Sequence, residues 1–99
     1  MSEKTLVKEQ IEVKVKKPKR YMVLMHNDDY TTMEFVVEVL VEFFNKSAAE
    51  AAKVMLDVHK KGAGIAGIYP YDIAVTKINQ VHNKARKTGF PLKLSLKEE

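Results

Sequence analysis

The chain has 99 residues, no cysteine and a formal net charge of +4. This length suits one domain with a single core, and the absence of cysteine excludes disulfides and thiolate metal sites and fits a reducing cytoplasm. No apolar run approaches the roughly 20 residues that cross a bilayer, and no apolar segment follows the N-terminal lysines as a signal peptide requires. We therefore expect a cytoplasmic protein that is not inserted in a membrane.

The positive charge is confined to the start of the chain. Residues 1–20 contain seven Lys or Arg and three Glu, whereas residues 21–99 contain ten of each sign. We predict a flexible basic N-terminal extension over 1–20 and a folded domain over 21–99. A folded nucleic-acid-binding domain would show a basic face, so nucleic acid is not an expected partner. The alternative, a tail that touches phosphates, predicts binding that disappears when 1–20 are deleted and falls steeply with salt.

The first element is "YMVLMH", residues 21–26, a short continuous apolar run that predicts a fully buried strand. The loop "NDDY" follows it. Thr31 and Glu34 then have the spacing of a capping box, so the first helix should begin there and end near Asn45. Its apolar positions recur at helical spacing: Met33, Val36, Val37, Leu40 and Phe44.

A second capping box, "SAAE" at 47–50, predicts a helix that ends at Gly62 and carries His59 on a broad apolar face. A short strand, 65–69, comes next. A third helix should run from Pro70 to Gly89, with His82 on its solvated face. Its core-facing positions should be Ile73, Ala74, Ile78, Val81 and Ala85. In the last strand, 91–97, Leu92, Leu94 and Leu96 alternate with polar residues.

These elements follow the order β-α-α-β-α-β. The order predicts an α+β, two-layer domain in which a three-stranded antiparallel sheet packs against three helices. No apolar stripe is left over once the core positions are assigned, so we expect a monomer.

Adjacent aspartates, Asp28 and Asp29, stand directly before the first helix. Asx side chains are common in turns, and a carboxylate is stabilised by the positive end of a helix dipole, but this explains one acid better than two. His59 would gain a functional role only if the fold brings it near Asn27 and Asp28. Met33 and Met55 suit either the core or an adaptable pocket wall.

Motifs for catalysis are missing from the sequence. It contains no GxSxG, no Gly-rich phosphate loop and no HExxH, so we predict neither an enzyme nor a bound cofactor. Two aspartates and two histidines could form an acid/base or metal site on paper, but neighbouring aspartates on an extended chain point in different directions.

The strings "VLMHNDDYTTMEFVVEVLVEFF", "AAKVMLDVHKKGAGIAGIY" and "TKINQVHNKARKTGFPL", with the closing leucine strand, resemble the ClpS family. The resemblance runs from Tyr21 to Leu96, and NDDYT-x-MEFV is its most specific part. ClpS proteins are adaptors of the ClpAP protease. The resemblance implies that this chain binds N-degrons, which begin with Leu, Phe, Tyr or Trp, and delivers them to a ClpA-type AAA+ unfoldase.

Particular residues inherit roles from this resemblance. Asn27 and His59 would bind the substrate α-amino group with the help of Asp28, and an ammonium group with three donors does need several converging acceptors. The side-chain pocket would consist of Asp29, Thr31, Met33, Val36, Met55, Val58 and Leu92. Met33 would be the gate that rejects β-branched side chains. Asp72 and Lys77 would contact the unfoldase, and the N-terminal extension would enter its machinery.

The sequence departs from the family pattern at several positions. Thr32 replaces a common proline. His26 replaces an aliphatic residue beside Asn27, and its protonation would oppose a cationic ligand, so we predict weaker binding at acidic pH. Pro70 and Tyr71 differ near the helix that faces the unfoldase.

Two alternatives in function remain open. One is a paralogous adaptor with an altered N-terminal preference. The other is an interaction domain like that of the ribosomal stalk, which has no pocket. Mutation of Asn27 or His59 would leave the activity of such a domain intact.

Overall fold

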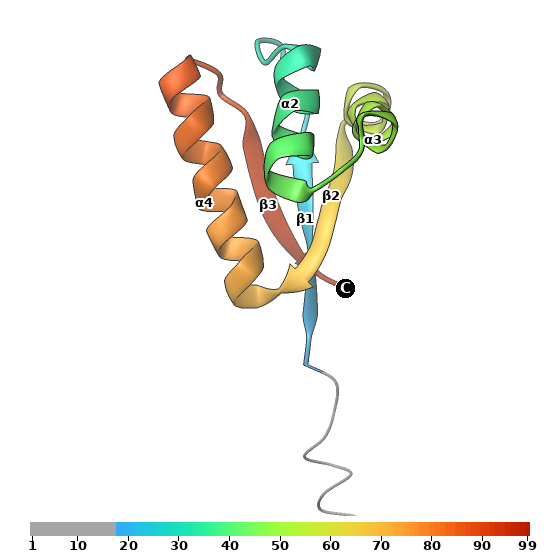
Figure 1. Ribbon diagram of the computed structural model, residues 1–99, viewed down its shortest axis with the longest axis vertical. Helices are drawn as coiled ribbons and strands as arrows, with labels where there is room; N and C mark the ends of the chain where they lie inside the picture. Colours follow the sequence, from blue (N-terminus) through green and yellow to red (C-terminus); the bar gives the residue numbers. More distant parts are fainter. Residues whose placement is uncertain (1–17) are drawn as a thin grey trace, which may run out of the picture.

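Three strands and three helices make up the part of the chain that the structure, a computed structural model, describes, which is residues 18–99 (Figure 1). The predicted order β-α-α-β-α-β is confirmed. Most of the predicted N-terminal extension, residues 1–17, lies outside the described residues. In chain order the elements are β1 (Arg20–His26), α2 (Met33–Phe44), α3 (Ala48–Lys61), β2 (Ala63–Pro70), α4 (Tyr71–Thr88) and β3 (Lys93–Glu98).

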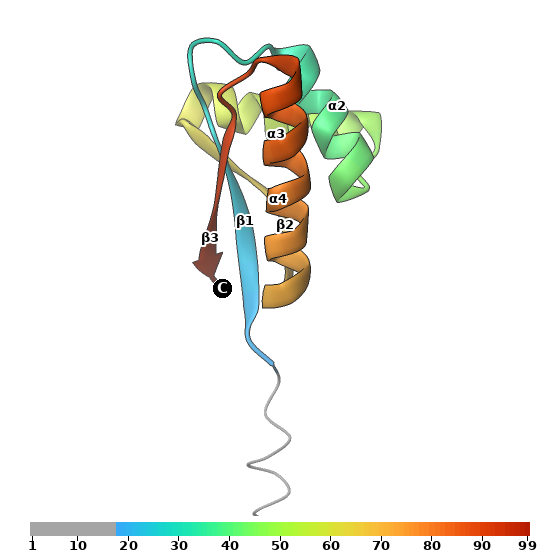
Figure 2. The same cartoon turned by 90° about the vertical axis from the view of Figure 1, so that its left-hand side faces the viewer.

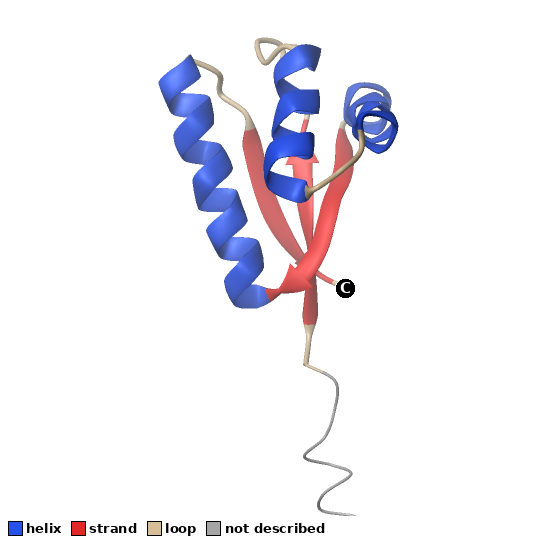
Figure 3. Cartoon of the chain, in the orientation of Figure 1, coloured by secondary structure: helices blue, strands red, loops and turns tan. Residues whose placement is uncertain are grey.

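The sheet has β1 at its centre, with β2 on one side and β3 on the other, and both pairings are antiparallel (Figure 3). A bulge interrupts the β1–β2 register between Val23 and Leu24. Helix α4 packs on all three strands, and α3 packs mainly on β2. Figure 2 shows α2 and α4 on one side of the sheet. The predicted two-layer α+β domain is therefore confirmed.

Only one face of β1 is buried, so the predicted fully buried strand is wrong. Val23 and Met25 are completely inaccessible, whereas Leu24 and His26 are half-buried on the opposite face. On the inner face, Met25 lies beside Leu94 of β3. The alternation follows from the two-layer architecture, because among residues 18–99 the helices α2 and α4 lie on one side of the sheet and leave the other face partly exposed.

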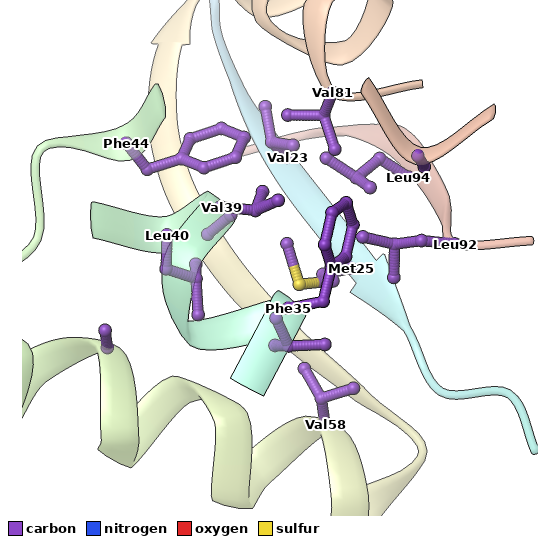
Figure 4. Packing of buried hydrophobic residues seen from close by; sticks show 14 of the residues in the cluster. Val23, Met25, Phe35, Val39, Leu40, Phe44, Val58, Val81, Leu92 and Leu94 are labelled. Carbon is purple, nitrogen blue, oxygen red and sulfur yellow. The ribbon is translucent and has the colours of Figure 1, made fainter. Parts of the chain in front are cut away.

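The core lies between the sheet and the helices (Figure 4). Helix α2 contributes most to it because this helix contacts both α3 and α4. The predicted core positions Val36, Leu40 and Phe44 are buried, and Phe35 and Val39 are buried with them. The apolar face of α2 is thus wider than the single stripe predicted from its periodicity.

The helix ends agree with the sequence signals except at the start of α2. Its N-cap is Thr32, whose hydroxyl accepts a hydrogen bond from the Phe35 N–H at 3.1 Å. The predicted cap at Thr31 is wrong because the Thr31 hydroxyl donates to Asp28 instead. The capping box of α3, Ser47 with Glu50, is confirmed.

The helices end where the sequence predicts. The residues that follow α2, α3 and α4 all adopt the left-handed conformation: Asn45, Gly62 and Gly89, with φ of 53°, 88° and 90°. Such residues end a helix because the next backbone N–H turns back to a carbonyl of the last turn. The end of α3 also fixes the position of His59, which lies in its last turn.

Two predictions on α4 are wrong. Ile73, predicted to face the core, is 48% exposed. His82, predicted to be solvated, is half-buried, and its Nε2 accepts a hydrogen bond from the Leu94 N–H at 3.0 Å. The first strand residues of β3 pass close to α4, and the imidazole satisfies a backbone donor there.

Candidate functional site

A hollow of about 260 Å³ opens between the loop after β1, the start of α2 and the C-terminal half of α3. A volume of this size is on the scale of one large amino-acid residue. Nine of the ten residues predicted to bind the amine and the side chain lie around it: Asn27, Asp28, Asp29, Thr31, Met33, Val36, Met55, Val58 and His59. Segments far apart in sequence thus converge at one place.

Asp28 is fixed by hydrogen bonds within the loop. Its Oδ1 accepts from the backbone N–H of Tyr30 at 2.8 Å and of Thr31 at 2.7 Å, and its Oδ2 accepts from the Thr31 hydroxyl at 2.6 Å. Burial raises the pKa of this carboxyl, but the hydrogen bonds from Thr31 and Tyr30 outweigh burial and hold the pKa below its ordinary value. Asp28 therefore has the turn role that the sequence suggested, and it presents a fixed negative charge to the hollow.

Asp29 differs from its neighbour. Its side chain is exposed, and among residues 18–99 it makes no hydrogen bond or ion pair. Hydrogen bonding within the turn thus explains why an aspartate stands at position 28 but not why one stands at position 29. This agrees with the expectation that a turn explains one of the two acids better than both. Two neighbouring carboxylates give this rim of the hollow a negative potential.

The loop is joined to the end of α3 by the backbone. The Asn27 N–H donates to the carbonyl of Gly62 at 2.9 Å, just after the helix ends. This bond brings Asn27 close to the last turn of α3, where His59 lies. His59 is exposed at the rim of the hollow instead of packing on an apolar face. The condition for a functional role of His59, proximity to Asn27 and Asp28, is met.

The apolar part of the hollow is built from α2 and α3. Val36 and Val58 are 5% and 3% exposed and belong to the core, so they are held rigidly. Met55 is half-buried, and Met33, at the first position of α2, is 46% exposed. A rigid floor beside a flexible thioether suits an apolar guest whose shape varies.

Gly64 explains how α3 comes so close to the sheet, and the sequence prediction missed this role. A Cβ at this position would lie 3.0 Å from Cγ2 of Val58 and 3.1 Å from the carbonyl oxygen of Val54. Glycine thus lets α3 lie directly on β2 and places the α3 wall of the hollow. The signal was present in the sequence, because glycine inside a strand often marks a close approach of backbone.

Leu92 is the one predicted pocket residue outside this hollow. It is 4% exposed and packs in the core beside Met25 and Phe35 (Figure 4). One edge of it reaches a second hollow near the end of α4. Its role in recognising a side chain stays a prediction.

Asp72 and Lys77, predicted to contact an unfoldase, lie in the first two turns of α4, at the end of the molecule away from the loop after β1 (Figure 1). Asp72 is exposed. Lys77 is half-buried, and its Nζ donates to the carbonyl of Phe43 at 2.7 Å and lies 5.1 Å from the centre of the Tyr69 ring. This lysine therefore ties α4 to the end of α2, and its role in an interface stays a prediction.

His26 points away from the hollow. Its Nε2 forms a hydrogen bond of 2.6 Å with Oγ of Ser95, on the outer face of the sheet. Since Asn27 lies around the hollow and His26 does not, the direct repulsion expected between a protonated His26 and a cationic ligand has no structural basis. The predicted acid sensitivity of binding stays a prediction and now depends on other groups.

The described part of the chain contains no cluster of three or more His, Cys, Asp or Glu side chains that could hold a metal ion. Within the same residues, 18–99, no helix is long and apolar enough to span a bilayer. The hollow offers hydrogen bonding and apolar contact through the residues that line it. Its acceptors are two carboxylates, an amide oxygen and an imidazole nitrogen, which together suit a compact cationic donor joined to an apolar body.

Comparison with known proteins gives consistent results. The family model described as ATP-dependent Clp protease adaptor protein ClpS matches residues 16–95. The ATP-dependent Clp protease adapter protein ClpS of Clostridium acetobutylicum is 59% identical, with 99% of each chain covered. The protein of the same name from Acetivibrio thermocellus is 54% identical, with 100% of each chain covered.

A solved structure is also similar. It shows ClpS2 of Agrobacterium tumefaciens bound to L-phenylalaninamide, and it superimposes with a TM-score of 0.80 at 36% sequence identity. The match covers 84% of this chain and 100% of that chain. The fold therefore agrees over nearly all of the residues that the structure describes.

Proposed function

The chain belongs to the ClpS family of ATP-dependent Clp protease adaptor proteins, and we propose that it is an adaptor that recognises N-degrons. In this proposal it binds the N-terminal residue of a substrate in the hollow between α2 and α3 and delivers the substrate to a ClpA-type unfoldase. The observation that carries the proposal is the meeting of polar acceptors and a rigid apolar floor in one hollow. The adaptor itself is not an enzyme.

The polar rim recognises the substrate α-amino group. An α-ammonium has three donors and one positive charge, so it is satisfied by acceptors that converge from different directions. Asn27 and His59 accept two of its hydrogen bonds, and the fixed carboxylate of Asp28 supplies the opposite charge. Charge-assisted hydrogen bonds contribute about 1.5–3 kcal/mol each, so a blocked amine loses most of the affinity.

The apolar floor recognises the side chain. Burial of a Leu or Phe side chain contributes roughly 1.5–3 kcal/mol. The floor formed by Val36 and Val58 accepts a long side chain, with Met55, Asp29 and Thr31 around it. Met33 stands at the entrance and excludes guests that branch at Cβ. The preferred N-terminal residues are then Leu, Phe, Tyr and Trp.

The ligand of the solved relative supports both halves of this proposal. L-Phenylalaninamide has a free α-amino group and a large aromatic side chain, and its carboxyl end is blocked as it would be in a peptide. The pocketless interaction domain considered from the sequence does not account for the hollow or for the family membership. A paralogous adaptor with a narrower preference would share the same site.

Fluorescence anisotropy with one labelled peptide in three forms tests the proposal. The forms begin with Leu, with N-acetylated Leu and with Val. We expect tight binding of the first alone, and at least about 100-fold weaker binding of the acetylated form, because several charge-assisted hydrogen bonds are lost together. Equal binding of the acetylated peptide would overturn recognition of the amine.

Variants make the test specific to the site. Asn27→Ala should weaken binding of the Leu peptide, whereas Asn79→Ala, which alters an exposed asparagine on α4, should not. Met33→Ala should narrow the difference between the Leu and Val peptides. If Asn27→Ala binds like the unmodified protein, the amine is recognised elsewhere.

Delivery needs a separate assay. Degradation of a Leu-tagged reporter by a ClpA-type unfoldase with its peptidase should depend on this protein and should be slower with Asp72→Asn. Because Asp72 is exposed, this substitution should not unfold the domain, so slower degradation would reflect a lost contact with the unfoldase. Asp57→Asn on α3 is a control. Lys77→Ala also removes the bond to Phe43, so its unfolding must be measured beside its activity. Deletion of residues 1–17 tests whether the extension takes part in delivery without affecting peptide binding.

A further inference from the structure

A second hollow, of about 310 Å³, lies between the C-terminal half of α4 and the start of β3. It is shallower than the first and differs from it in charge. Its floor is apolar and its sides are basic, and the residues around it are His82, Arg86, Phe90, Pro91, Leu92 and Lys93. Neither the resemblance nor the proposed amine pocket, which is the first hollow with Asn27, Asp28 and His59 at its rim, uses the basic residues among them.

The polar groups of this basic hollow are donors. Arg86 and Lys93 are exposed cations, and none of the described residues around the hollow is a carboxylate. His82 accepts the Leu94 N–H with its Nε2, so its neutral ring carries the hydrogen on Nδ1. Among residues 18–99 no buried side-chain nitrogen lacks a partner, so this Nδ1–H is in contact with solvent. Arg86 also donates to Oδ1 of Asn83. The polar side chains around the hollow thus present donors, which favours an anion.

The pKa of the His82 imidazole also reflects the positive potential around it. Burial lowers the pKa of His82, and the positive charges of Arg86 and Lys93 lower it further. Both cations, one from α4 and one from β3, therefore act on the same point. The first residue of β3 and the second half of α4 together maintain a positive potential beside an apolar surface.

The basic hollow lies close to the amine pocket. Lys93 is the strand partner of His26, so its side chain shares the outer face of the sheet with His26, while its backbone lies beside the start of the loop at Asn27. Paired Cα atoms in antiparallel strands are about 5 Å apart and consecutive ones about 3.8 Å, so the Cα atoms of Lys93 and Asn27 are at most about 9 Å apart. An extended chain advances about 3.3 Å per residue, which puts the third to fifth residues of a bound polypeptide within reach of the hollow.

We propose that the basic hollow binds carboxylate side chains at about the third to fifth positions of the polypeptide whose N-terminus occupies the amine pocket. The inference rests on the proposed function and extends it from the first residue to a preference among the residues that follow. The ends of the site have opposite charges, since Asp28 faces the amine and Arg86 and Lys93 receive the acids. Such a charge pattern fixes the direction in which the chain leaves the pocket.

Two general electrostatic effects must be distinguished from specific binding of carboxylates in the basic hollow. The protein carries a net charge of +4, which attracts any acidic peptide. Cations in the last turn of α4 also complement the helix dipole without binding anything. Lys87, in the same turn of α4, and Lys97, on β3, are exposed and lie outside the hollow, so they offer a control with an equal change of charge.

The experiment compares three peptides that begin with Leu and have the same length. One has Glu at positions three to five, one has Gln there, and one has Glu at positions eight to ten. Each is measured by anisotropy at about 50 mM salt with the full chain, with Arg86→Gln/Lys93→Gln and with Lys87→Gln/Lys97→Gln. The substituted side chains are exposed, so neither double variant should unfold.

We expect the peptide with Glu at positions three to five to bind roughly two- to tenfold tighter than the Gln peptide. Arg86→Gln/Lys93→Gln should abolish this ratio and leave the Gln peptide unaffected, and the control variant should retain it. The same peptide should raise the pKa of His82, followed by NMR, whereas the Gln peptide should not, because binding and protonation are linked.

Three results would overturn the inference. They are equal binding of all three peptides, a ratio that the two double variants reduce equally, and an equal gain from Glu at positions eight to ten. If the Leu peptide still binds more tightly than the acetyl-Leu peptide in these cases, the proposed function stands although this inference fails. If the acetylated peptides bind as well as those with a free amine, the proposed function fails and this inference fails with it.

Discussion

Helices α3 and α4 each carry a histidine towards the C-terminal end, and the two side chains have opposite surroundings. His59 on α3 is exposed at the rim of the proposed amine pocket, and its imidazole makes no hydrogen bond with any residue of 18–99. His82 on α4 is half-buried, and its Nε2 accepts the N–H of Leu94. The open nitrogen of His59 is available to the ligand that we propose, whereas the bonded nitrogen of His82 supports the fold.

The difference extends to the regions around the two histidines. On the α4 side, polar groups join elements: Lys77 donates to the Phe43 carbonyl, and Lys84 bridges Glu38 and Glu42 of α2. On the pocket side, the side chains of Asn27 and Asp29 make no such bonds within the described residues. Acceptors without internal partners are hydrated in the unbound protein, so a ligand amine replaces water and not a protein contact.

Asp28 both holds its loop by hydrogen bonds and carries a charge at the rim of the pocket. Its removal should therefore weaken peptide binding more than any other substitution considered below. Asp28→Ala deletes the charge that we propose faces the amine, together with the three hydrogen bonds that hold the loop at Tyr30 and Thr31. Binding of a Leu peptide should fall at least about 100-fold, because charge-assisted hydrogen bonds and the loop are lost together. Titration of a labelled Leu peptide, followed by fluorescence anisotropy, measures this loss of affinity.

Asp29→Ala is the matched control, since it removes the same charge from the next position without removing a hydrogen bond within residues 18–99. Its effect should be smaller, on the order of a few-fold, as expected for a nearby exposed charge. Equal losses in the two variants would mean that rim charge alone matters and that the hydrogen-bonded loop does not.

His82→Ala should separate fold from binding on the α4 side. The variant leaves the Leu94 N–H without its acceptor at a position that is 4% exposed. An unsatisfied buried donor costs about 1–3 kcal/mol, so the free energy of unfolding in urea should fall by that amount. Affinity for a Leu peptide with neutral residues at positions three to five should stay within about twofold.

His82→Gln is the informative companion, because its amide oxygen can still accept. It should recover part of the lost stability. No change in the unfolding free energy of His82→Ala would mean that water replaces the imidazole at Leu94, and the contrast between the two histidines would lose its basis.

His59→Ala should give the opposite pattern with a smaller free-energy change. The variant removes one acceptor of the amine, and affinity for the Leu peptide should fall about tenfold. The free energy of unfolding should change by less than about 0.5 kcal/mol, since His59 is exposed and outside the core. A large loss of stability would show that this histidine also supports the end of α3.

The sequence predicted the order of elements and the helix ends because these depend on local signals. Ser47 with Glu50 starts α3, and left-handed residues such as Gly62 and Gly89 end helices wherever they stand. The start of α2 was displaced by one residue because Asp28 takes the hydroxyl of Thr31, and a cap that competes with a loop contact cannot be read from spacing alone.

Convergence of the pocket residues was beyond local reasoning. Periodicity placed His59 on a helix face without showing that Asn27 would lie beside it. Two non-local features produce that proximity: the bond from the Asn27 N–H to Gly62, and the close approach of α3 to β2 at Gly64. The family resemblance named the pocket residues because it carries such long-range information, and it was silent on His82, whose partner is a backbone group.

The smallest expected effect is a dependence of stability on pH that belongs to His82 and not to the pocket acids. Burial, Arg86 and Lys93 lower the pKa of His82 below its ordinary value of 6.5. Between the lowered pKa and 6.5 the unfolded chain binds a proton that the folded protein does not, so stability rises with pH across this window. The contribution of His82 is complete above pH 6.5 and is lost as the pH falls towards the folded pKa.

Asp28 acts in a different range. Its pKa is lowered from 3.8, so its contribution to stability is complete above that value and is lost only in stronger acid. Urea unfolding at pH 7, 6 and 5 should therefore show a decline in the unmodified protein that is shallower in His82→Gln, while Asp28→Asn should leave the slope unchanged over this range. If the free energy of unfolding falls equally with pH in the unmodified protein and in His82→Gln, the acid-sensitive group is not His82. The difference between the two slopes isolates His82, because every other titrating group is common to both proteins.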